Sequence, residues 1–134
     1  MKVEAETSQL ILRLPARPEY LMFSRLVLTG LSRAVEIDPE TLADLKVAVS
    51  EACSYAIRTG GGSEGTIAVC YELRPNEVAV EVEAELVGRE SPPDEESLGE
   101  GDLGLAIIRA LVDQLEVEHE PDGQVSRFSF SKSV

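Results

Sequence analysis

A glycine-rich segment, G-E-G-D-L-G-L at residues 99–105, is the part of this sequence best suited to bind a phosphate group. Its glycines let backbone N–H groups converge, and the helix predicted directly after them adds the partial positive charge of its N-terminus. Glu100 and Asp102 lie within the segment and are unfavourable to an anion. Many glycine turns that precede helices bind nothing, so the segment indicates a phosphate loop only where other residues of a site accompany it.

Two further segments could complete such a site. In V-A-V-S-E-A-C-S-Y, residues 47–55, Glu51 follows Ala48 by three positions, so a helix would place its carboxylate beside an apolar stripe, able to point into a cleft. An ordinary glutamate at the boundary of a buried face has the same spacing. The other segment, residues 84–99, ends a strand and continues into a long acidic loop with paired prolines, for which a solvated connector is the alternative.

The residue types present do not support other kinds of catalysis. The single histidine, His119, lies in a predicted strand without an obvious serine or cysteine partner, and no group of residues shows metal-ligand spacing. Cys53 and Cys70 are expected to be reduced and buried thiols, one in a helix and one in a strand. The sequence therefore predicts neither a catalytic triad nor a metal cluster.

The charge of the chain limits its partners. Its 134 residues fit one domain, and the formal net charge is −13. Such an acidic surface repels phosphate backbones and anionic lipid, which argues against direct binding to nucleic acid or membranes and favours a basic protein partner. Residues 1–9 are unlike a signal peptide, and no apolar run reaches the ~20 residues of a membrane span. We therefore expect a cytoplasmic protein, with residues 1–8 as a flexible N-terminus.

Hydrophobic periodicity, prolines and glycine turns predict the order β-α-α-β-β-α-β-β. The strands are predicted at residues 9–14, 66–73, 77–85, 116–120 and 124–131, and the helices from Pro18 to Ala34, from Pro39 to Arg58 and from Leu103 to Leu115. Hairpin-connected strands predict a two-layer α/β sandwich, in which a mostly antiparallel mixed sheet carries the helices on one face. We expect a single domain over residues 1–134, with residues 89–100 as a long loop.

The strand at residues 77–85 has one apolar side. Its apolar positions keep a period of two without interruption, so they should face the helices while the glutamates between them face solvent. These positions are Val78, Val80, Val82, Ala84 and Leu86. A pocket for a purine needs a polar group on that face, and this pattern offers none.

Taken in order, these segments resemble the anti-sigma-factor serine kinases of bacteria, which belong to the GHKL, or histidine-kinase-like, ATPases. The resemblance rests on L-R-L-P-A-R-P-E-Y, R-L-V-L-T-G, D-L-K-V-A-V-S-E-A-C and E-G-D-L-G-L-A-I-I-R-A-L-V-D, and it spans residues 10–134. It implies the histidine-kinase-like ATPase fold, ATP and Mg²⁺ bound between helices and sheet, and homodimers that act in stress response. It also implies two protein partners: a sigma factor held inactive, and a STAS-domain antagonist phosphorylated on a serine.

The resemblance assigns roles to two residues that would act on protein partners. Glu51 matches the general base toward the substrate serine. Arg25 matches an arginine that docks the sigma factor and the antagonist on a shared surface. Arg25 lies in a largely apolar stretch of the first helix, so an arginine whose guanidinium only reaches solvent is the alternative.

At the nucleotide site the sequence departs from the family. The positions that match the phosphate loop are Gly99, Gly101, Gly104 and Leu105. Residues 89–99 match the lid over the nucleotide. The family's Mg²⁺-ligating asparagine is replaced by Tyr55, and a phenol is a poor ligand for Mg²⁺. The aspartate that binds the adenine amino group is replaced by Ala84, and the glycine two residues later by Leu86.

Three hypotheses remain open. In the first, which the departures favour, the chain is a binding module that keeps the fold and a partner surface while ATP binding and kinase activity are weakened or lost. In the second it is a working serine kinase that uses compensating groups, such as Glu85 for adenine. In the third it is a structural partner of another signalling protein.

Overall fold

The computed structural model describes residues 8–59, 65–85, 95–119 and 125–134. Its elements follow the predicted order, with one short 3₁₀ turn (η1) added before the first helix. They are β1 (Ser8–Pro15), η1 (Pro18–Tyr20), α1 (Met22–Ala34), α2 (Pro39–Thr59), β2 (Thr66–Arg74), β3 (Glu77–Glu85), α3 (Glu95–Leu111), β4 (Gln114–His119) and β5 (Val125–Ser133). Of the predicted flexible N-terminus, Ser8 begins β1, and residues 1–7 lie outside the described residues.

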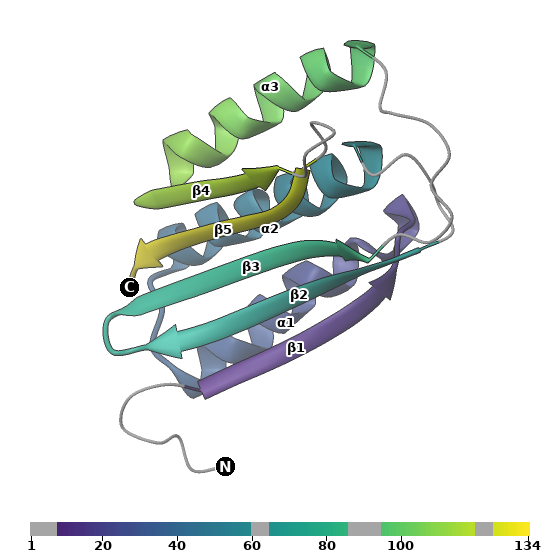
Figure 1. Cartoon of the computed structure of the whole chain (residues 1–134). Coiled ribbons are helices and arrows are strands. Elements are labelled where there is room, and N and C mark those ends of the chain that lie inside the picture. Colours follow the sequence, from purple (N-terminus) through teal and green to yellow (C-terminus); the bar gives the residue numbers. More distant parts are fainter. Residues whose placement is uncertain (1–7, 60–64, 86–94, 120–124) are drawn as a thin grey trace.

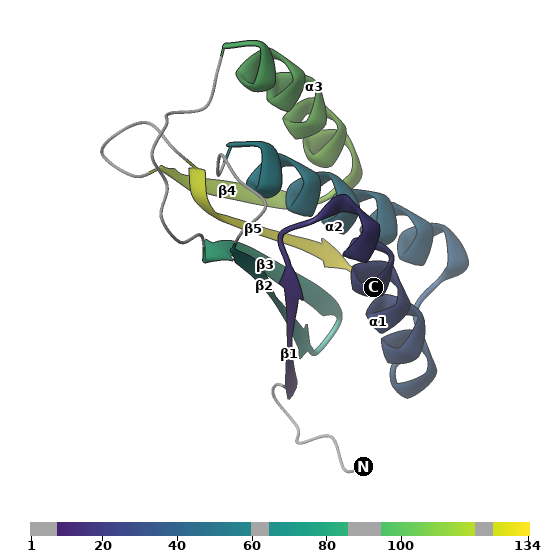
Figure 2. The ribbon, with the colours of Figure 1, turned by 90° about the vertical axis from the view of Figure 1, so that its right-hand side faces the viewer.

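The five strands form one sheet in the order β1-β2-β3-β5-β4, and each neighbouring pair is antiparallel. The sheet is therefore fully antiparallel, where the sequence predicted a mixed one. No parallel pair arises, because β1 pairs only with β2 and β5 lies between β3 and β4. The helices lie on one face of the sheet (Figure 1 and Figure 2), which confirms the predicted two-layer sandwich.

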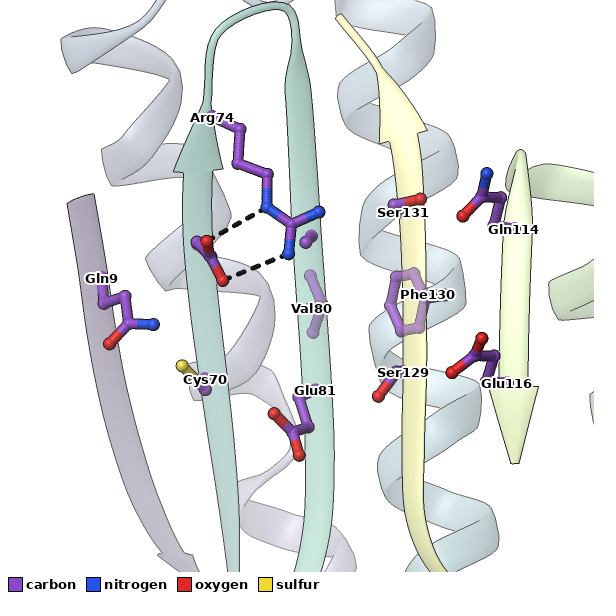
Figure 3. Close-up of a pocket in the computed structure, with 12 residues that line it drawn as sticks. Gln9, Cys70, Arg74, Val80, Glu81, Gln114, Glu116, Ser129, Phe130 and Ser131 are labelled. Atoms are coloured by element: carbon purple, nitrogen blue, oxygen red, sulfur yellow. Dashed lines mark hydrogen bonds and ion pairs between the residues drawn. The ribbon is translucent and has the colours of Figure 1, made fainter. Parts of the chain in front are cut away.

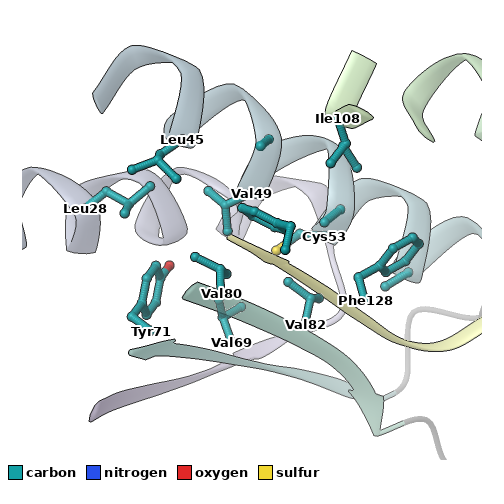
Figure 4. Close-up of a cluster of buried hydrophobic side chains, with 14 of the residues drawn as sticks. Leu28, Leu45, Val49, Cys53, Val69, Tyr71, Val80, Val82, Ile108 and Phe128 are labelled. Carbon is teal, nitrogen blue, oxygen red and sulfur yellow. The ribbon is translucent and has the colours of Figure 1, made fainter. Parts of the chain in front are cut away.

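Helix α2 packs over β3 and β5 and fills the middle of the core. Asp38 caps its N-terminus, because Oδ2 accepts hydrogen bonds from the backbone N–H groups of Glu40 at 3.1 Å and Thr41 at 3.2 Å. Apolar side chains of α2 then recur every three or four residues toward the sheet, among them Leu45 and Val49 (Figure 4). This periodicity fixes which side of α2 meets the strands and which sides remain for other helices.

Strand β3 alternates as the sequence predicted. Val80 and Val82 are buried against the helices, and Ala84 on the same side is partly buried against the core. On the opposite side, the side chains of Glu81 and Glu83 are 41% and 47% exposed and pair with Arg127 of β5. One face of the sheet is thus buried under helices, and the other carries charged side chains in contact with solvent.

Helix α3 begins at Glu95, eight residues before the predicted start at Leu103. Residues 99–102 of the glycine segment, which we predicted to be a loop before the helix, are therefore helical, and that prediction was wrong. The sequence signal missed was the pair of glutamates at residues 95 and 96, since acidic residues favour the first turn of a helix. Of the predicted lid at residues 89–100, residues 89–94 lie outside the described residues, and the rest belongs to α3.

Helix α3 also ends earlier than predicted, at Leu111. Its last carbonyl oxygen accepts a hydrogen bond from Nζ of Lys132 in β5 at 2.7 Å, which gives this helix end a cationic cap. Asp113 then accepts a hydrogen bond from the backbone N–H of Ser133 at 2.7 Å, and β4 starts one residue later. Contacts with β5, distant in sequence, therefore decide where this helix stops. Among the described residues, no helix is both long and apolar enough to cross a membrane.

Candidate functional site

The predicted general base, Glu51, lies on the side of α2 that faces α3. A Cβ atom added to Gly104 of α3 would lie 3.3 Å from Oε2 of Glu51 and 3.8 Å from Nη2 of Arg58. Glu51 and Arg58 are both partly buried, so solvent still reaches them. The structure thus brings together two of the predicted site residues, Glu51 and Gly104.

The same contact contains two residues that the sequence analysis missed, Ser54 and Arg58. Nη1 of Arg58 donates a hydrogen bond to Oγ of Ser54 at 2.7 Å. Residues 51, 54 and 58 are spaced by three and four, so they share one side of the helix. This spacing of polar residues is present in the sequence, but our prediction considered only Glu51 and the apolar stripe beside it.

Tyr55, which the family resemblance aligns with a Mg²⁺ ligand, packs toward the sheet. Its side chain is 3% exposed, and its ring packs edge-on against Phe128 of β5, with ring centroids 5.1 Å apart and planes at 87°. It belongs to the hydrophobic core. A neutral phenol held there does not suit Mg²⁺, which prefers oxygen ligands around an octahedral site. Among the described residues, no group of three or more His, Cys, Asp or Glu could hold a metal ion.

Ala84, at the position of the adenine-binding aspartate, lies on the helix-facing side of β3. It is paired with Ile67 of β2 and packs against the core. It therefore presents a methyl group where the family resemblance leads us to expect a carboxylate. Leu86 lies outside the described residues. The side chain of Glu85, which the second hypothesis considers as a compensating contact to adenine, lies outside them as well.

The predicted phosphate-loop residues lie within α3. Gly99, Gly101, Gly104 and Leu105 are all more than three residues from the start of the helix at Glu95. Only the first four N–H groups of an α-helix lack a partner within it, so these residues do not present converging free N–H groups in this conformation. Gly104 is buried and Leu105 packs partly buried against the core.

Arg25 on α1 is tied to α2. Its Nη1 donates a hydrogen bond to Oγ of Ser50 at 2.8 Å, and the residue is only partly buried. The guanidinium therefore lies between the two helices with part of its surface accessible. This position is compatible with partner binding, and it shows that the side chain is not simply extended into solvent.

A buried polar cluster lies directly beneath Arg25. The hydroxyl of Tyr71 donates to the carbonyl oxygen of Ser24 at 2.7 Å, and Cys53 lies beside it in the core. Burial raises the pKa of the Cys53 thiol to about 12, which outweighs the lowering by a hydrogen bond with Ser24 and by the charge of Arg25. Cys53 is therefore a buried and unreactive thiol, as predicted.

The open face of the sheet carries a separate depression of about 290 Å³. Its lining residues include Cys70, Glu72, Arg74 and Glu81. Figure 3 shows the side chains of Cys70, Arg74 and Glu81 on this face. Cys70 is partly exposed here, so its predicted burial was wrong. Burial, Glu81 and Glu72 together raise the pKa of its thiol. None of the predicted site residues lines this depression.

Comparisons with known proteins agree with this architecture. The model of the histidine kinase-like ATPase domain family matches residues 14–130. The serine-protein kinase RsbW of Bacillus pumilus is 32% identical over 130 residues, covering 84% of this chain and 80% of its own length. The same kinase of Listeria innocua is 30% identical over 126 residues, with the same two shares.

A solved structure supports the fold independently. The crystal structure of the RsbU and RsbW domains of Rv1364c from Mycobacterium tuberculosis superimposes with a TM-score of 0.71 at 21% sequence identity. The match covers 94% of this chain and 32% of that longer protein. The family match, the two similar kinases and the shared fold lead to one conclusion: this chain belongs to the histidine kinase-like ATPases, in the branch of the RsbW-type anti-sigma-factor serine kinases.

Proposed function

We propose that this chain is a regulatory binding module of its family, in which ATP–Mg²⁺ binding and kinase activity are weakened or lost. The observation that carries the proposal is the position of Tyr55, whose ring is part of the core and packs edge-on against Phe128. A side chain held there cannot be exchanged for a metal ligand without opening a cavity. The methyl group of Ala84 on the helix-facing side of β3 removes the adenine contact as well.

The proposed losses of the adenine contact and of the metal ligand determine the affinity that we expect for ATP–Mg²⁺. One missing hydrogen bond to a charged group costs ~1.5–3 kcal/mol, which is about ten- to hundredfold in affinity. Loss of the metal ligand adds to this, because Mg²⁺ neutralises the phosphate charge in a protein whose own net charge is −13. We therefore expect ATP–Mg²⁺ to bind with a dissociation constant on the order of 1 mM or weaker.

Isothermal titration calorimetry of the full chain with ATP–Mg²⁺ tests this expectation. An active RsbW-type kinase serves as the positive control under the same conditions. A low-micromolar dissociation constant would contradict the proposal, whereas no measurable heat or millimolar binding would support it.

The proposed partners are a sigma factor and a STAS-domain antagonist, bound by a homodimer that acts in stress response in the cytoplasm. The relatives are serine-protein kinases of the RsbW type, and Arg25 remains partly accessible beside Ser50. Arginine is enriched at interface hot spots because its planar fork makes paired hydrogen bonds to carboxylates. In so acidic a protein, a cationic contact on α1 would also orient an acidic patch of a partner.

Replacing Arg25 with alanine should weaken partner binding by ~2 kcal/mol or more, while stability changes by ~1 kcal/mol or less through loss of one hydrogen bond. Ser50→Ala is the matched control, since it removes the same 2.8 Å hydrogen bond but keeps the guanidinium. The measurement is a titration against the partner that co-purifies with the chain and is identified by mass spectrometry. Equal affinity of Arg25→Ala and the wild type would remove Arg25 from the interface.

A working kinase is the second candidate, and the place of Glu51 favours it. The carboxylate is partly exposed at the contact with Gly104, where a base toward a serine hydroxyl could act. ATP-dependent phosphorylation of a serine on a STAS-domain antagonist, abolished by Glu51→Gln, would establish this function and displace the first.

A further inference from the structure

Helix α1, which lies beside α2 in the layer of helices (Figure 2), presents an apolar side to solvent. Ser24 and Leu28 are buried on its inner side, and Leu26 lies about 200° around the helix from each, so it points outward. Leu26 is 52% exposed, and Met22 and Phe23 on the same outer side are 49% and 43% exposed. No other helix or strand carries as many exposed large apolar side chains among the described residues. An exposed apolar surface of this kind indicates a site of interaction.

Gly30 continues the outer side of α1 one turn after Leu26 and leaves a space in it. A Cβ atom at Gly30 would meet nothing within 4 Å, so none of the described residues fills this space. Met22 lies one turn before Leu26, at the same distance from it in the other direction. Methionine is unbranched and flexible, which suits it to fill irregular gaps. The outer side thus has a projecting side chain toward one end and an open space toward the other.

Opposite charges lie at the two ends of this apolar side. Glu19 in η1 is seven residues before Leu26, and Arg33 is seven residues after it. Seven residues are close to two turns, so both charged groups lie near the line of Leu26, about 10 Å from it along the helix. Both are exposed, and neither takes part in an ion pair within the part of the chain that the structure describes. We call the outer side of α1 from Glu19 to Arg33 the α1 face.

We propose that a second copy of this chain covers the α1 face, in a two-fold symmetric dimer whose α1 helices run antiparallel and cross at Leu26. This inference rests on the proposed homodimer and names its interface. A two-fold axis at Leu26 makes the contact self-complementary, since each residue before Leu26 meets the one equally far after it in the other copy. Met22 of each copy then lies at the level of Gly30 of the other, and Glu19 lies at the level of Arg33.

The α1 face suits a second copy better than the open face of the sheet does. The depression on the sheet is lined by three glutamates, Glu72, Glu81 and Glu116, and by one arginine, Arg74. Two copies that met there would bring like charges together, in a protein of net charge −13. On the α1 face the same symmetry brings opposite charges together. Arg25 lies to one side, bonded to α2, and remains partly accessible to another partner.

The size of the α1 face determines the expected strength of the dimer. Helix α1 has 13 residues and is therefore about 20 Å long. A standard interface buries about 800 Å² of each partner, which is more than one face of such a helix supplies. We therefore expect a weak dimer, with a dissociation constant on the order of 10 μM.

Analytical ultracentrifugation of the full chain, at concentrations on both sides of this value, measures the dimer. Arg33→Glu should weaken it about tenfold or more, because two carboxylates then oppose each other at both ends of the interface. The double variant Glu19→Arg with Arg33→Glu exchanges the two charges and should restore the affinity to within about threefold of the wild type. Such a recovery requires that the two positions meet across the interface. Circular dichroism and a melting curve verify that each variant is folded.

A cross-linking experiment tests the position of the two-fold axis. In a Cys70→Ser background, Leu26→Cys places two thiols at the axis, where copper phenanthroline and oxygen should join the copies through a disulfide. Gly30→Cys is the control, because its two copies would lie about 12 Å apart along the helices. A disulfide joins Cα atoms no more than about 7 Å apart. Non-reducing electrophoresis should show the covalent dimer for Leu26→Cys alone, and cross-linking of Gly30→Cys alone would overturn the crossing at Leu26.

A matched pair of apolar substitutions separates the two candidate surfaces. Leu26→Ser should weaken the dimer about tenfold, whereas Ile11→Ser, which removes a side chain 55% exposed on the open face of the sheet, should change nothing. A dimer that only Ile11→Ser weakens would overturn the α1 face as the interface while the proposed homodimer stands.

The remaining outcomes are equally decisive. A dimer that Arg33→Glu weakens and the double variant restores supports the proposal. A double variant that stays as weak as Arg33→Glu would overturn it, and a chain that is monomeric at every concentration would overturn the proposed homodimer as well. Tight ATP–Mg²⁺ binding would instead contradict the proposed loss of nucleotide binding alone, so the failures are distinguishable.

Discussion

Two sides of helix α2 lie in different environments in this molecule. Toward the sheet, α2 presents a packed apolar surface in which Tyr55 meets Phe128 edge-on. Toward α3, it presents a polar surface that we call the α2–α3 seam, formed by Glu51, Ser54 and Arg58 opposite Gly104 of α3. Tyr55, which the family resemblance aligns with a Mg²⁺ ligand, is thus part of the core, while Glu51, which it aligns with the general base, lies at a partly exposed polar contact.

The difference shows that neighbouring positions of one helix can be constrained by different interactions. Tyr55 follows Glu51 by four residues, an offset of only about 40° around the helix, yet the ring of Tyr55 is buried in the core while Glu51 is partly exposed. A substitution on the sheet side changes stability mainly through packing, because a protein interior tolerates few voids. A substitution on the seam acts mainly through charge and hydrogen bonding, because the side chains there are partly exposed to solvent.

The largest expected effect on stability comes from removing a buried side chain on the sheet-facing side of α2. Tyr55→Ala removes a ring that is 3% exposed and should lower the free energy of unfolding by ~3–5 kcal/mol. Ser54→Ala, the adjacent residue on the seam side, removes one partly exposed hydrogen bond and should cost ~1 kcal/mol or less. Urea denaturation of both variants gives the comparison. Similar losses in the two variants would mean that the two sides of α2 are not energetically distinct.

A second change tests whether the lost site can be rebuilt. The triple variant Tyr55→Asn, Ala84→Asp and Leu86→Gly restores the family's residues and should recover part of the ATP–Mg²⁺ affinity. It also removes apolar burial, so stability should fall by on the order of 1–4 kcal/mol. Calorimetry on the folded variant is the measurement, with Tyr55→Asn alone as the control for lost packing. No gain in affinity would show that the pocket was remodelled beyond these three positions.

Much of this arrangement was predictable from the sequence, because it depends on local periodicity. The alternation of β3 predicted that Ala84 would face the helices, and the three- and four-residue steps of α2 predicted its buried side. Family membership followed from motifs in a fixed order. The mixed character of the sheet was predicted wrongly, since the pairing of β5 between β3 and β4 depends on long-range contacts that a linear pattern does not encode.

The candidate site was less predictable, for a physical reason. Glycines at residues 99–105 suggested a loop through their low helix propensity, but propensity is a weak prior that tertiary packing overrides. Here the packing of α3 on α2 depends on the missing side chain of Gly104, which only the structure reveals. Arg58 was missed because its significance comes from α3, an element far away in the sequence.

The smallest expected effect compares two glycines within helices. Alanine in place of glycine normally stabilises a helix by ~0.5–1 kcal/mol. A Cβ at Gly30, on the exposed side of α1, meets nothing within 4 Å, so Gly30→Ala should give that gain in full. At Gly104 the new methyl group would lie 3.3 Å from Oε2 of Glu51, and Gly104→Ala should therefore gain nothing or lose up to ~1 kcal/mol as the seam opens. Thermal unfolding of the two variants measures the difference, and Gly104→Ala combined with Glu51→Ala should recover part of the gain, because the methyl group then has space. Equal stabilisation by both single substitutions would show that α3 does not pack closely on the polar side of α2, and the α2–α3 seam would then lose its structural basis.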